Sequence, residues 1–407
     1  RSPCWARPTR SSSRGSIHQV PDGTLSADVL SSIAEIPAAV WNGLAPGHDG
    51  VVDNPFLDHR FLLALEQSGS ASNRTGWQPQ HLLLSDSAGA PVGAMPLYLK
   101  SHSQGEYVFD HGWADAFQRA GGEYYPKLQC AVPFTPVTGP RFLARDDATR
   151  AAVIRTAETL ATRNNISSVH ATFVSEAEAD LARGSGWLVR HDTQYHWHNE
   201  GFSSFEDFLG TLSSRHRKVT RRERRDALEA DGLTVRWLTG SELTEQVWDA
   251  FFEFYQDTGS RKWGRPYLNR RFFSLLSEAM ADRILLMFAY DGDEPIAGTF
   301  SMIGHDRLYG RYWGATRNVP FLHFELCYYQ AIDYAIAHKL PVVEAGAQGE
   351  HKLARGYAPA TTRSVHWIGH PGLRDAVARF VAQERASVAR EQEQLERYTP
   401  FRHGDPH

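Results

Sequence analysis

The spacing of apolar residues divides most of the chain into predicted helices and strands. In the second half, three short apolar runs separated by polar turns predict an antiparallel meander over 284–290, 296–303 and 307–313. A helical stripe over 321–338 and a short strand over 341–345 follow. The same reasoning predicts further helices at 36–44, 60–68, 147–164, 176–183, 242–257, 270–281 and 374–397, and further strands at 81–84, 92–100, 107–109, 169–174, 187–198, 233–238 and 363–368.

Between the regular segments of the first half lies a stretch, 111–141, that is rich in proline, glycine and aromatic residues. Such a composition predicts an irregular, shaped surface suited to binding a ligand. The alternative is that the aromatic side chains fill a core. The candidate substrate-binding residues in and beside this stretch are Tyr107, Asp110, Trp113, Tyr125, Lys127, Phe134 and Arg141.

An internal repeat links the two halves. The segment A-P-V-G-A-M-P-L-Y-L from Ala90 is similar to E-P-I-A-G-T-F-S-M-I from Glu294, and both precede an aromatic-rich segment. A repeat of this length predicts two copies of one α/β domain, with separate sheets and a shared cleft. We expect an extension or disordered segment over 1–35, domains over 36–200 and 233–370, a basic linker helix over 201–232, and a C-terminal helix and tail over 371–407.

Composition narrows the functional classes. The chain has 407 residues, 42% of them hydrophobic and 22% charged, and its formal net charge is −4, so no global field draws it to nucleic acid or anionic lipid. Its three cysteines, Cys4, Cys130 and Cys327, form no CxxC pair, which argues against a disulfide scaffold or structural zinc. This cysteine usage fits a reducing compartment, so we expect a cytoplasmic protein. Without an apolar run of about eighteen residues, no membrane span is predicted.

The stretch V-V-E-A-G-A-Q-G-E-H-K-L-A-R-G-Y, over 342–357, combines the end of a predicted buried strand with two glycines and several charged groups. Ligands of open α/β sheets bind just beyond the carboxyl ends of strands. We therefore predict Glu350, Lys352 and Arg355 as catalytic residues and His351 as a substrate-binding residue. The alternative is a glycine turn flanked by solvated charges.

Other candidates lie close by in the predicted fold. Strand alternation would place Tyr309, Arg311 and Trp313 on one face, and His323 and Glu325 sit at the predicted start of the helix over 321–338. The basic run over 214–225 is either a solvated helix face or a phosphate-contacting helix. Two alternating histidines at 196 and 198 without a third ligand are a weak metal signal, so no metal site is predicted.

The order strand, two helices, three antiparallel strands, helix, strand resembles that of GNAT acyltransferases, and two tandem copies resemble the FemAB family of aminoacyl transferases. The motifs that carry the resemblance are S-R-H-R-K-V-T-R-R-E-R-R, G-T-F-S-M-I-G-H-D-R-L-Y-G-R-Y-W-G-A and V-E-A-G-A-Q-G-E-H-K-L-A-R-G-Y-A-P. Together they are similar to a bacterial branch of predicted N-acyltransferases linked to peptidoglycan biosynthesis. The resemblance implies that Lys352 holds a carboxylate or stabilises developing negative charge.

Two departures bear on the acyl donor. GNAT enzymes hold the CoA pyrophosphate on a glycine-rich loop at the start of the central helix, and here that place holds N-V-P-F-L-H-F-E. FemAB transferases that use aminoacyl-tRNA often carry a long helical arm, and the segment over 202–231 is short. We expect no tightly bound cofactor, an activated donor such as acyl-CoA or aminoacyl-tRNA, and a small-molecule or peptide amine as acceptor. Nucleic acid is a partner only if the donor is tRNA.

The leading hypothesis is an N-acyltransferase. The alternative from another class is a non-catalytic module that recognises cell-wall peptides or another protein on its aromatic cleft, because a GNAT scaffold can keep binding without chemistry. A hydrolase is disfavoured, since the sequence has no G-x-S-x-G elbow.

Overall fold

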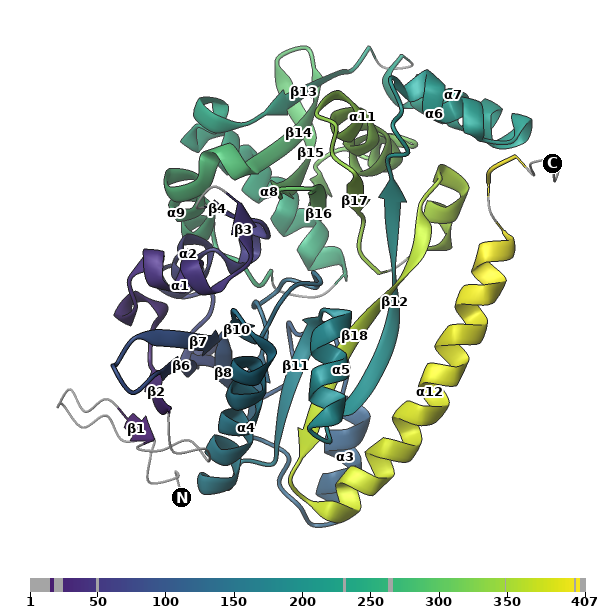
Figure 1. The fold of residues 1–407 in the computed structure, drawn as a ribbon. Helices are drawn as coiled ribbons and strands as arrows, with labels where there is room; N and C mark the ends of the chain where they lie inside the picture. Colours follow the sequence, from purple (N-terminus) through teal and green to yellow (C-terminus); the bar gives the residue numbers. More distant parts are fainter. Residues whose placement is uncertain are drawn as a thin grey trace.

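The computed structural model describes residues 15–17, 25–48, 51–229, 232–262, 266–347, 349–398 and 400–402. One mixed sheet of eleven strands runs through both halves, in the order β13–β14–β15–β16–β17–β12–β18–β11–β9–β8–β5 (Figure 1). Its strands are β13 Thr234–Leu238, β14 Ile284–Asp291, β15 Glu294–Ile303, β16 Arg307–Ala315, β17 Val342–Glu344, β12 Leu188–His198, β18 Ala358–Ile368, β11 Ser168–Val174, β9 Lys127–Cys130, β8 Leu97–Lys100 and β5 Trp77–Pro79.

The prediction of two separate sheets is wrong, because the halves exchange strands. The last strand of the second half, β18, lies between β11 and β12 of the first half, with His366 opposite His170 and Val365 opposite Val189. Strand β12 in turn pairs with β17, where Trp197 faces Val343. These pairings join residues far apart in sequence, so local patterns could not reveal them.

A second, five-stranded sheet belongs to the first half, in the order β1–β2–β6–β7–β10. Its strands are β1 Gly15–Ile17, β2 Ser26–Leu30, β6 His81–Ser85, β7 Pro91–Met95 and β10 Leu143–Ala144, and a small hairpin pairs β3 Gly47–His48 with β4 Val51–Val52. Part of the predicted extension over 1–35 therefore belongs to the fold. The predicted strand over 92–100 is divided at Pro96, which has no N–H to donate, and its two parts join different sheets.

Helices cover both faces of the large sheet (Figure 1). They are α1 Ala38–Leu44, α2 His59–Gln67, α3 His111–Arg119, α4 Asp147–Arg163, α5 Glu176–Gly184, α6 Phe205–Thr211, α7 Ser214–Leu228, α8 Glu245–Lys262, α9 Arg270–Met280, α10 Leu322–Phe324, α11 Gln330–Ala337 and α12 Pro371–Arg397. Short 3-10 turns lie at Ile33–Glu35, Pro55–Leu57, Asn73–Thr75, Gly240–Glu242, Ala281–Arg283 and Glu350–Arg355. None of the described helices combines the length and apolar character needed to cross a membrane.

The halves share a hydrophobic core as well as a sheet. Phe61 on α2 meets Phe272 on α9 edge to face, with ring centroids 5.7 Å apart, and both rings are buried. The C-terminal helix α12 packs along β12 and β18, as Figure 1 shows in yellow. Because apolar burial is the dominant stabilising contribution, this shared core fixes the two halves against each other.

A parallel strand pair recurs once in each half. In the first half β9 pairs with β11, and in the second β16 pairs with β17. The second strand of each pair has an antiparallel neighbour on its other side, β18 beside β11 and β12 beside β17. A helical segment connects the two strands of each pair, α4 in the first half and α10 to α11 in the second. The strand arrangement repeats, with β8, β9 and β11 in the places of β15, β16 and β17. The sequence repeat covers only its start, because the counterpart of β16 is β9 and not the aligned residues 107–109.

Two expectations for the first half require correction. Residues 107–109 form a loop rather than a strand, and Tyr107 has a left-handed backbone with φ of 59°. The stretch over 111–141 is not irregular throughout, since it contains α3 and the buried strand β9.

Candidate functional site

The candidate site lies where two parallel strands diverge. Strands β16 and β17 pair at Arg307 with Val342, Leu308 with Val343 and Tyr309 with Glu344, and the described register ends there. Beyond that point, within the described residues, no strand pairs with the edge of β16 that faced β17. Its backbone polar groups are therefore available to a ligand.

A β-bulge lies in the same part of β16. Phe300 on β15 faces Tyr312, but Ser301 faces Gly310, so Arg311 is an extra residue without a partner on β15. The bulge reverses which face later side chains occupy. Tyr309 and Tyr312 pack in the core shared by the halves, whereas Trp313 packs beside Leu322 and Leu326 on the other face. The prediction that Tyr309, Arg311 and Trp313 share a face is wrong for this reason.

The helix above the divergence is not continuous. Between α10 and α11 the residues Glu325–Tyr329 form a π-helical turn. The helical segment also begins at Phe321, whose left-handed backbone has φ of 62°. π-Helical turns are rare, but those that do occur are often found at functional sites. They change the direction in which side chains project from the helix.

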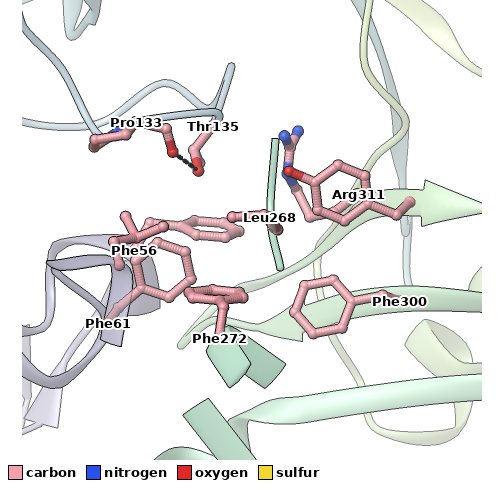
Figure 2. A pocket seen from close by; sticks show the side chains of 10 residues that line it. Phe56, Phe61, Pro133, Thr135, Leu268, Phe272, Phe300 and Arg311 are labelled. Carbon is pink, nitrogen blue, oxygen red and sulfur yellow. Dashed lines mark hydrogen bonds between the residues drawn. The ribbon is translucent and has the colours of Figure 1, made fainter. Parts of the chain in front are cut away.

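A cavity of about 140 Å³ fills the space between the diverging strands and this helix. Its polar lining residues are Thr299, Ser301, Arg311, His323, Cys327 and Tyr328, and Trp313 and Ala345 add to its walls. A much smaller cavity of about 10 Å³ lies among aromatic side chains and also touches Arg311 (Figure 2). That volume holds a single water at most, so only the larger cavity can take a substrate group.

Loops of the first half reach the wall of the larger cavity. The guanidinium of Arg311 donates to the carbonyl of Phe134 at 2.8 Å, and the Tyr312 hydroxyl donates to the same oxygen at 3.1 Å. The ring of Phe134 stacks on that of Tyr267 with centroids 4.9 Å apart, and Tyr107 meets the Tyr267 ring edge to face. Phe134 and Tyr107 both have φ of 59°, a conformation that costs energy in residues other than glycine and is concentrated at functional sites.

The turn after β17 carries four of the predicted residues, Glu350, His351, Lys352 and Arg355. Lys352 is 3% exposed and donates from Nζ to the carbonyl of Gly346 at 3.1 Å, one residue beyond Ala345 of the cavity wall. Burial lowers the pKa of Lys352 to about 8. His351 Nε2 lies 2.9 Å from the hydroxyl of Tyr328. The side chain of the predicted base Glu350 lies outside the part of the chain that the structure describes.

Arg355 and Glu325 are both engaged in buried ion pairs away from the cavity lining. Arg355 donates to both carboxylate oxygens of Glu223 on α7 and stacks over the ring of Phe324. Glu325 accepts from Arg224 on α7 at 2.9 and 3.1 Å. Both residues thus join the basic helix α7 to the candidate site, and neither lines the cavity.

Glu344 is a titratable residue at the divergence that the sequence analysis left out of its candidates. It is 3% exposed and accepts from Arg307 at 3.0 Å, and no described residue forms a hydrogen bond with its Oε2. Burial raises the pKa of Glu344 to about 7. His196 on β12 approaches this carboxylate to 3.9 Å, and burial lowers the pKa of His196 to about 4. The signal in the sequence that could have identified Glu344 was a glutamate at the end of an apolar strand.

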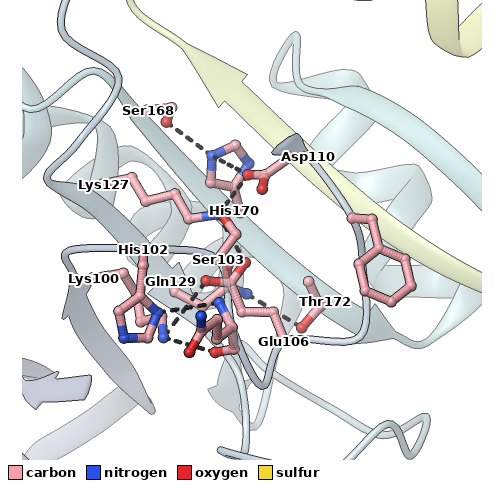
Figure 3. Close-up of polar contacts among 12 residues, drawn as sticks. Lys100, His102, Ser103, Glu106, Asp110, Lys127, Gln129, Ser168, His170 and Thr172 are labelled. Atoms are coloured by element: carbon pink, nitrogen blue, oxygen red, sulfur yellow. Dashed lines mark hydrogen bonds and ion pairs between the residues drawn. The ribbon is translucent and has the colours of Figure 1, made fainter. Parts of the chain in front are cut away.

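Two of the predicted first-half residues, Asp110 and Lys127, belong to a buried polar cluster that lines neither of the two cavities described here (Figure 3). Lys127 is fully buried and contacts the carboxylates of Asp110 and Glu106. Lys100 lies 3.8 Å from Glu106 and 3.6 Å from the centroid of the Trp77 ring. Burial raises the pKa of Glu106 to about 7 and lowers that of Lys100 to about 7.

The remaining first-half candidates also contact the protein interior. Trp113 is 6% exposed and packs with Leu373 and Val377 of α12. Tyr125 hydrogen-bonds the Ser103 hydroxyl at 2.7 Å. Arg141 is buried, and its guanidinium donates to four backbone carbonyls, those of Val137, Gly139, Pro140 and Thr172. Of the predicted set, the structure brings Arg311, Trp313 and His323 into the cavity wall and places Phe134, Tyr107 and His351 beside it.

Solved structures of other proteins are similar to this chain in fold. FemX has a TM-score of 0.51 at 12% sequence identity, covering 84% of this chain and 98% of FemX. The C-terminal domain of a protein assigned as a lysylphosphatidylglycerol synthetase from Agrobacterium fabrum has a TM-score of 0.50 at 8% identity, covering 86% and 97%. A tandem GNAT protein from the clavulanic acid biosynthesis pathway has a TM-score of 0.44 at 12% identity, covering 85% and 99%. A search of curated protein sequences finds no match.

The similarity to FemX, together with the strand pair that recurs in each half, confirms the predicted fold class of two tandem GNAT-like units with a C-terminal helix. The sequence itself matches the family model described as FemAB-like, peptidoglycan biosynthesis/recognition, over residues 32–403. The chain therefore belongs to the FemAB-like family.

Proposed function

We propose that the protein is an N-acyltransferase that moves an acyl or aminoacyl group onto an amine, in the cavity where β16 and β17 diverge. The observation that carries the proposal is the combination of an unpaired strand edge with a cavity of about 140 Å³ against it. Backbone N–H groups on that edge suit a carbonyl oxygen whose negative charge grows as the amine attacks. The family description supports a peptidoglycan-related amine, such as a peptide of a wall precursor, as acceptor.

The proposed reaction needs two proton transfers. The amine nitrogen bonds to the acyl carbon, the bond from that carbon to the donor's sulfur or oxygen breaks, and the amine proton must leave while the departing atom gains one. His323 lines the cavity, and an imidazole can accept a proton near neutral pH. Tyr328 lines the cavity too, and its hydroxyl lies 2.9 Å from His351 Nε2, so it can pass the second proton to the departing atom.

The other residues position these groups. Lys352 fixes the carbonyl of Gly346 directly after Ala345 of the cavity wall, so we assign it a positioning role. Arg311 combines a cavity position with a guanidinium that can hold a substrate carboxylate. The aromatic rings of Tyr107, Phe134 and Tyr267 next to it form the side on which we place the acceptor.

We propose a donor that bears phosphate groups and is held from helix α7. This helix packs on α10 and the π-helical turn and exposes Arg215, Lys218 and Arg222 to solvent. Acyl-CoA and aminoacyl-tRNA both meet this description, and both are made in the cytoplasm, where we place the reaction. A tightly bound cofactor is not part of the proposal.

A recognition module is the second candidate. The observation that favours it is the partly buried aromatic group at the junction of the halves, since stacked rings of this kind also bind peptides without chemistry. Loss of the proton acceptor distinguishes the two candidates, because it affects turnover but not ligand affinity. His323→Gln removes turnover in an enzyme and leaves ligand affinity unchanged in a recognition module.

The test is a transfer assay with acyl-CoAs and aminoacyl-tRNAs as donors and muropeptides as acceptors, read by mass spectrometry of the acceptor. We expect product with wild-type protein and a loss of about a hundredfold or more in His323→Gln. The matched control is His198→Gln, which changes an exposed histidine on β12 away from the cavity lining. Equal turnover in the two variants would contradict the assignment of His323.

A further inference from the structure

We propose that His48, Asp53 and His305 form a binding site for a divalent transition-metal ion at the junction of the two halves. Each residue offers one ligand atom, and these three atoms lie within 4.8 Å of one another. His48 belongs to the β3–β4 hairpin, Asp53 follows that hairpin, and His305 lies in the turn between β15 and β16. In the part of the chain that the structure describes, no other group brings three such side chains together.

The backbone around these residues is held in place from several directions. The N–H of His305 donates to the carbonyl of Asp53 at 3.0 Å, so the two ligands are fixed across the junction. Arg283 donates to the carbonyls of Val52 and Asp53 at 3.2 Å and to that of Ile303 at 2.7 Å. At Gly304 a Cβ would lie 2.8 Å from the ring of Tyr309 and 3.3 Å from the Asp53 carbonyl, so this close approach requires glycine.

The side chains themselves are nearly arranged for coordination. His48 Nδ1 lies 2.6 Å from Asp53 Oδ1, and the rings of His48 and His305 stack with centroids 4.2 Å apart and planes at 9°. Tetrahedral ligands bonded at about 2.1 Å lie about 3.4 Å apart, so small side-chain rotations would close the set around an ion. The side chain of His48 is 62% exposed, which allows both that rotation and water in the remaining coordination positions.

The donor set selects the class of ion. Two imidazole nitrogens and one carboxylate suit Zn²⁺, Co²⁺, Ni²⁺ or Cu²⁺, whereas Mg²⁺ and Ca²⁺ prefer oxygen ligands. An ion here would link the hairpin of the first half to the turn that begins β16, the strand whose far end lines the cavity. The inference does not depend on the proposed transferase activity.

The experiment uses full-length, tag-free protein stripped with a chelator and titrated with Zn²⁺ by calorimetry. Co²⁺ absorption serves as a second readout of coordination. We expect one tight equivalent of Zn²⁺ and a rise in melting temperature with added ion. His305→Ala and Asp53→Asn should each weaken Zn²⁺ binding by about a hundredfold. Loss of a residue that only supports a metal ligand can already weaken binding by this factor, and loss of the ligand itself should weaken it at least as much. His198→Ala, which removes another exposed histidine, should bind as wild type does.

Two results would overturn the site. One is that stripped wild-type protein takes up no Zn²⁺ or Co²⁺ at about 0.1 mM ion, a concentration far above the dissociation constants of three-ligand protein sites. The other is that His305→Ala and Asp53→Asn bind with the stoichiometry and affinity of wild type, which would place the ion elsewhere. Asp53→Asn keeps the backbone contacts of Asp53, so it separates loss of a ligand from loss of the fold.

Discussion

Arg355 and Glu223 form a buried ion pair that joins the turn after β17 to the basic helix α7. Nη2 of Arg355 lies 2.8 and 2.7 Å from the two carboxylate oxygens of Glu223, and the two side chains are 7% and 8% exposed. The hydroxyl of Tyr329, in the π-helical turn, donates to the same carboxylate. Glu223 therefore holds together the helix, the turn and the wide helical segment that surround the cavity.

Removing one partner should leave an uncompensated buried charge. For Arg355→Met we expect a loss of about 3 kcal/mol in the free energy of unfolding, measured by urea denaturation with circular dichroism. The control is Arg221→Met, which breaks an exposed pair between Arg221 on α7 and Glu206 on α6 and should leave the unfolding midpoint unchanged. An Arg355→Met variant as stable as its control would show that the pair does not hold α7 in place.

The buried cluster of the first half should behave as a structural element. Lys127→Met removes the ammonium that contacts Asp110 and Glu106 and leaves two buried carboxylates, so we expect a loss of about 3–5 kcal/mol in unfolding free energy. Lys218→Met, an exposed lysine on α7, should change stability by less than about 0.5 kcal/mol. If Lys127→Met folds with wild-type stability and instead loses ligand binding, Lys127 belongs to a substrate site after all.

Much of the secondary structure followed from local patterns. Helix α2, predicted at 60–68, is His59–Gln67, and α9, predicted at 270–281, is Arg270–Met280. In both, apolar residues recur at helical spacing and meet a core. By contrast, β9 escaped prediction because its sequence K-L-Q-C looks half polar, although all four residues are buried and Lys127 is neutralised by acids from a distant loop.

The candidate site was only partly predictable, for a geometric reason. Arg311 was named from strand alternation and His323 from its place at the start of a predicted helix. The alternation rule misplaced Trp313 because nothing local marks the bulge at Arg311. Lys352 was expected to point into the cleft, whereas it is buried and tied to the carbonyl of Gly346. The pairing of β17 and β18 with strands of the first half joins residues more than a hundred positions apart, which a local pattern does not contain.

Glu344 should give stability a specific pH dependence. Burial raises the pKa of Glu344 to about 7 in the folded protein, above its ordinary value of about 4.5. The folded state therefore binds more protons between these values, and this contribution is fully present below about pH 4.5 and is lost as pH rises to about 7. We expect the stability difference between wild type and Glu344→Gln to shift against wild type over this window, by at most about 1.4 kcal/mol per pH unit. Parallel stability curves for the two proteins would contradict the shifted pKa.

The start of the central helical segment should bind acetyl-CoA poorly. A pyrophosphate cradle needs free backbone N–H groups that a phosphate can approach closely. Here residues 316–325 contain no glycine, and Phe321, just before the first turn, has a left-handed backbone. Calorimetry should detect no micromolar binding of acetyl-CoA that depends on this helix start. Micromolar binding that is abolished by substitutions between Asn318 and His323 would show that this helix start does hold the cofactor.

The central claim is that acyl transfer takes place in the cavity between β16 and β17. Its most direct test is transfer to a muropeptide amine by a variant in which that cavity is filled, Ala345→Leu, read by mass spectrometry with the same donor panel. Ala386→Leu, an exposed position on α12, adds the same atoms away from the cavity lining. We predict that wild type and Ala386→Leu form product at equal rates and that Ala345→Leu, with its fold intact by circular dichroism, loses at least about tenfold in rate. Product formed by Ala345→Leu at the wild-type rate would contradict the account.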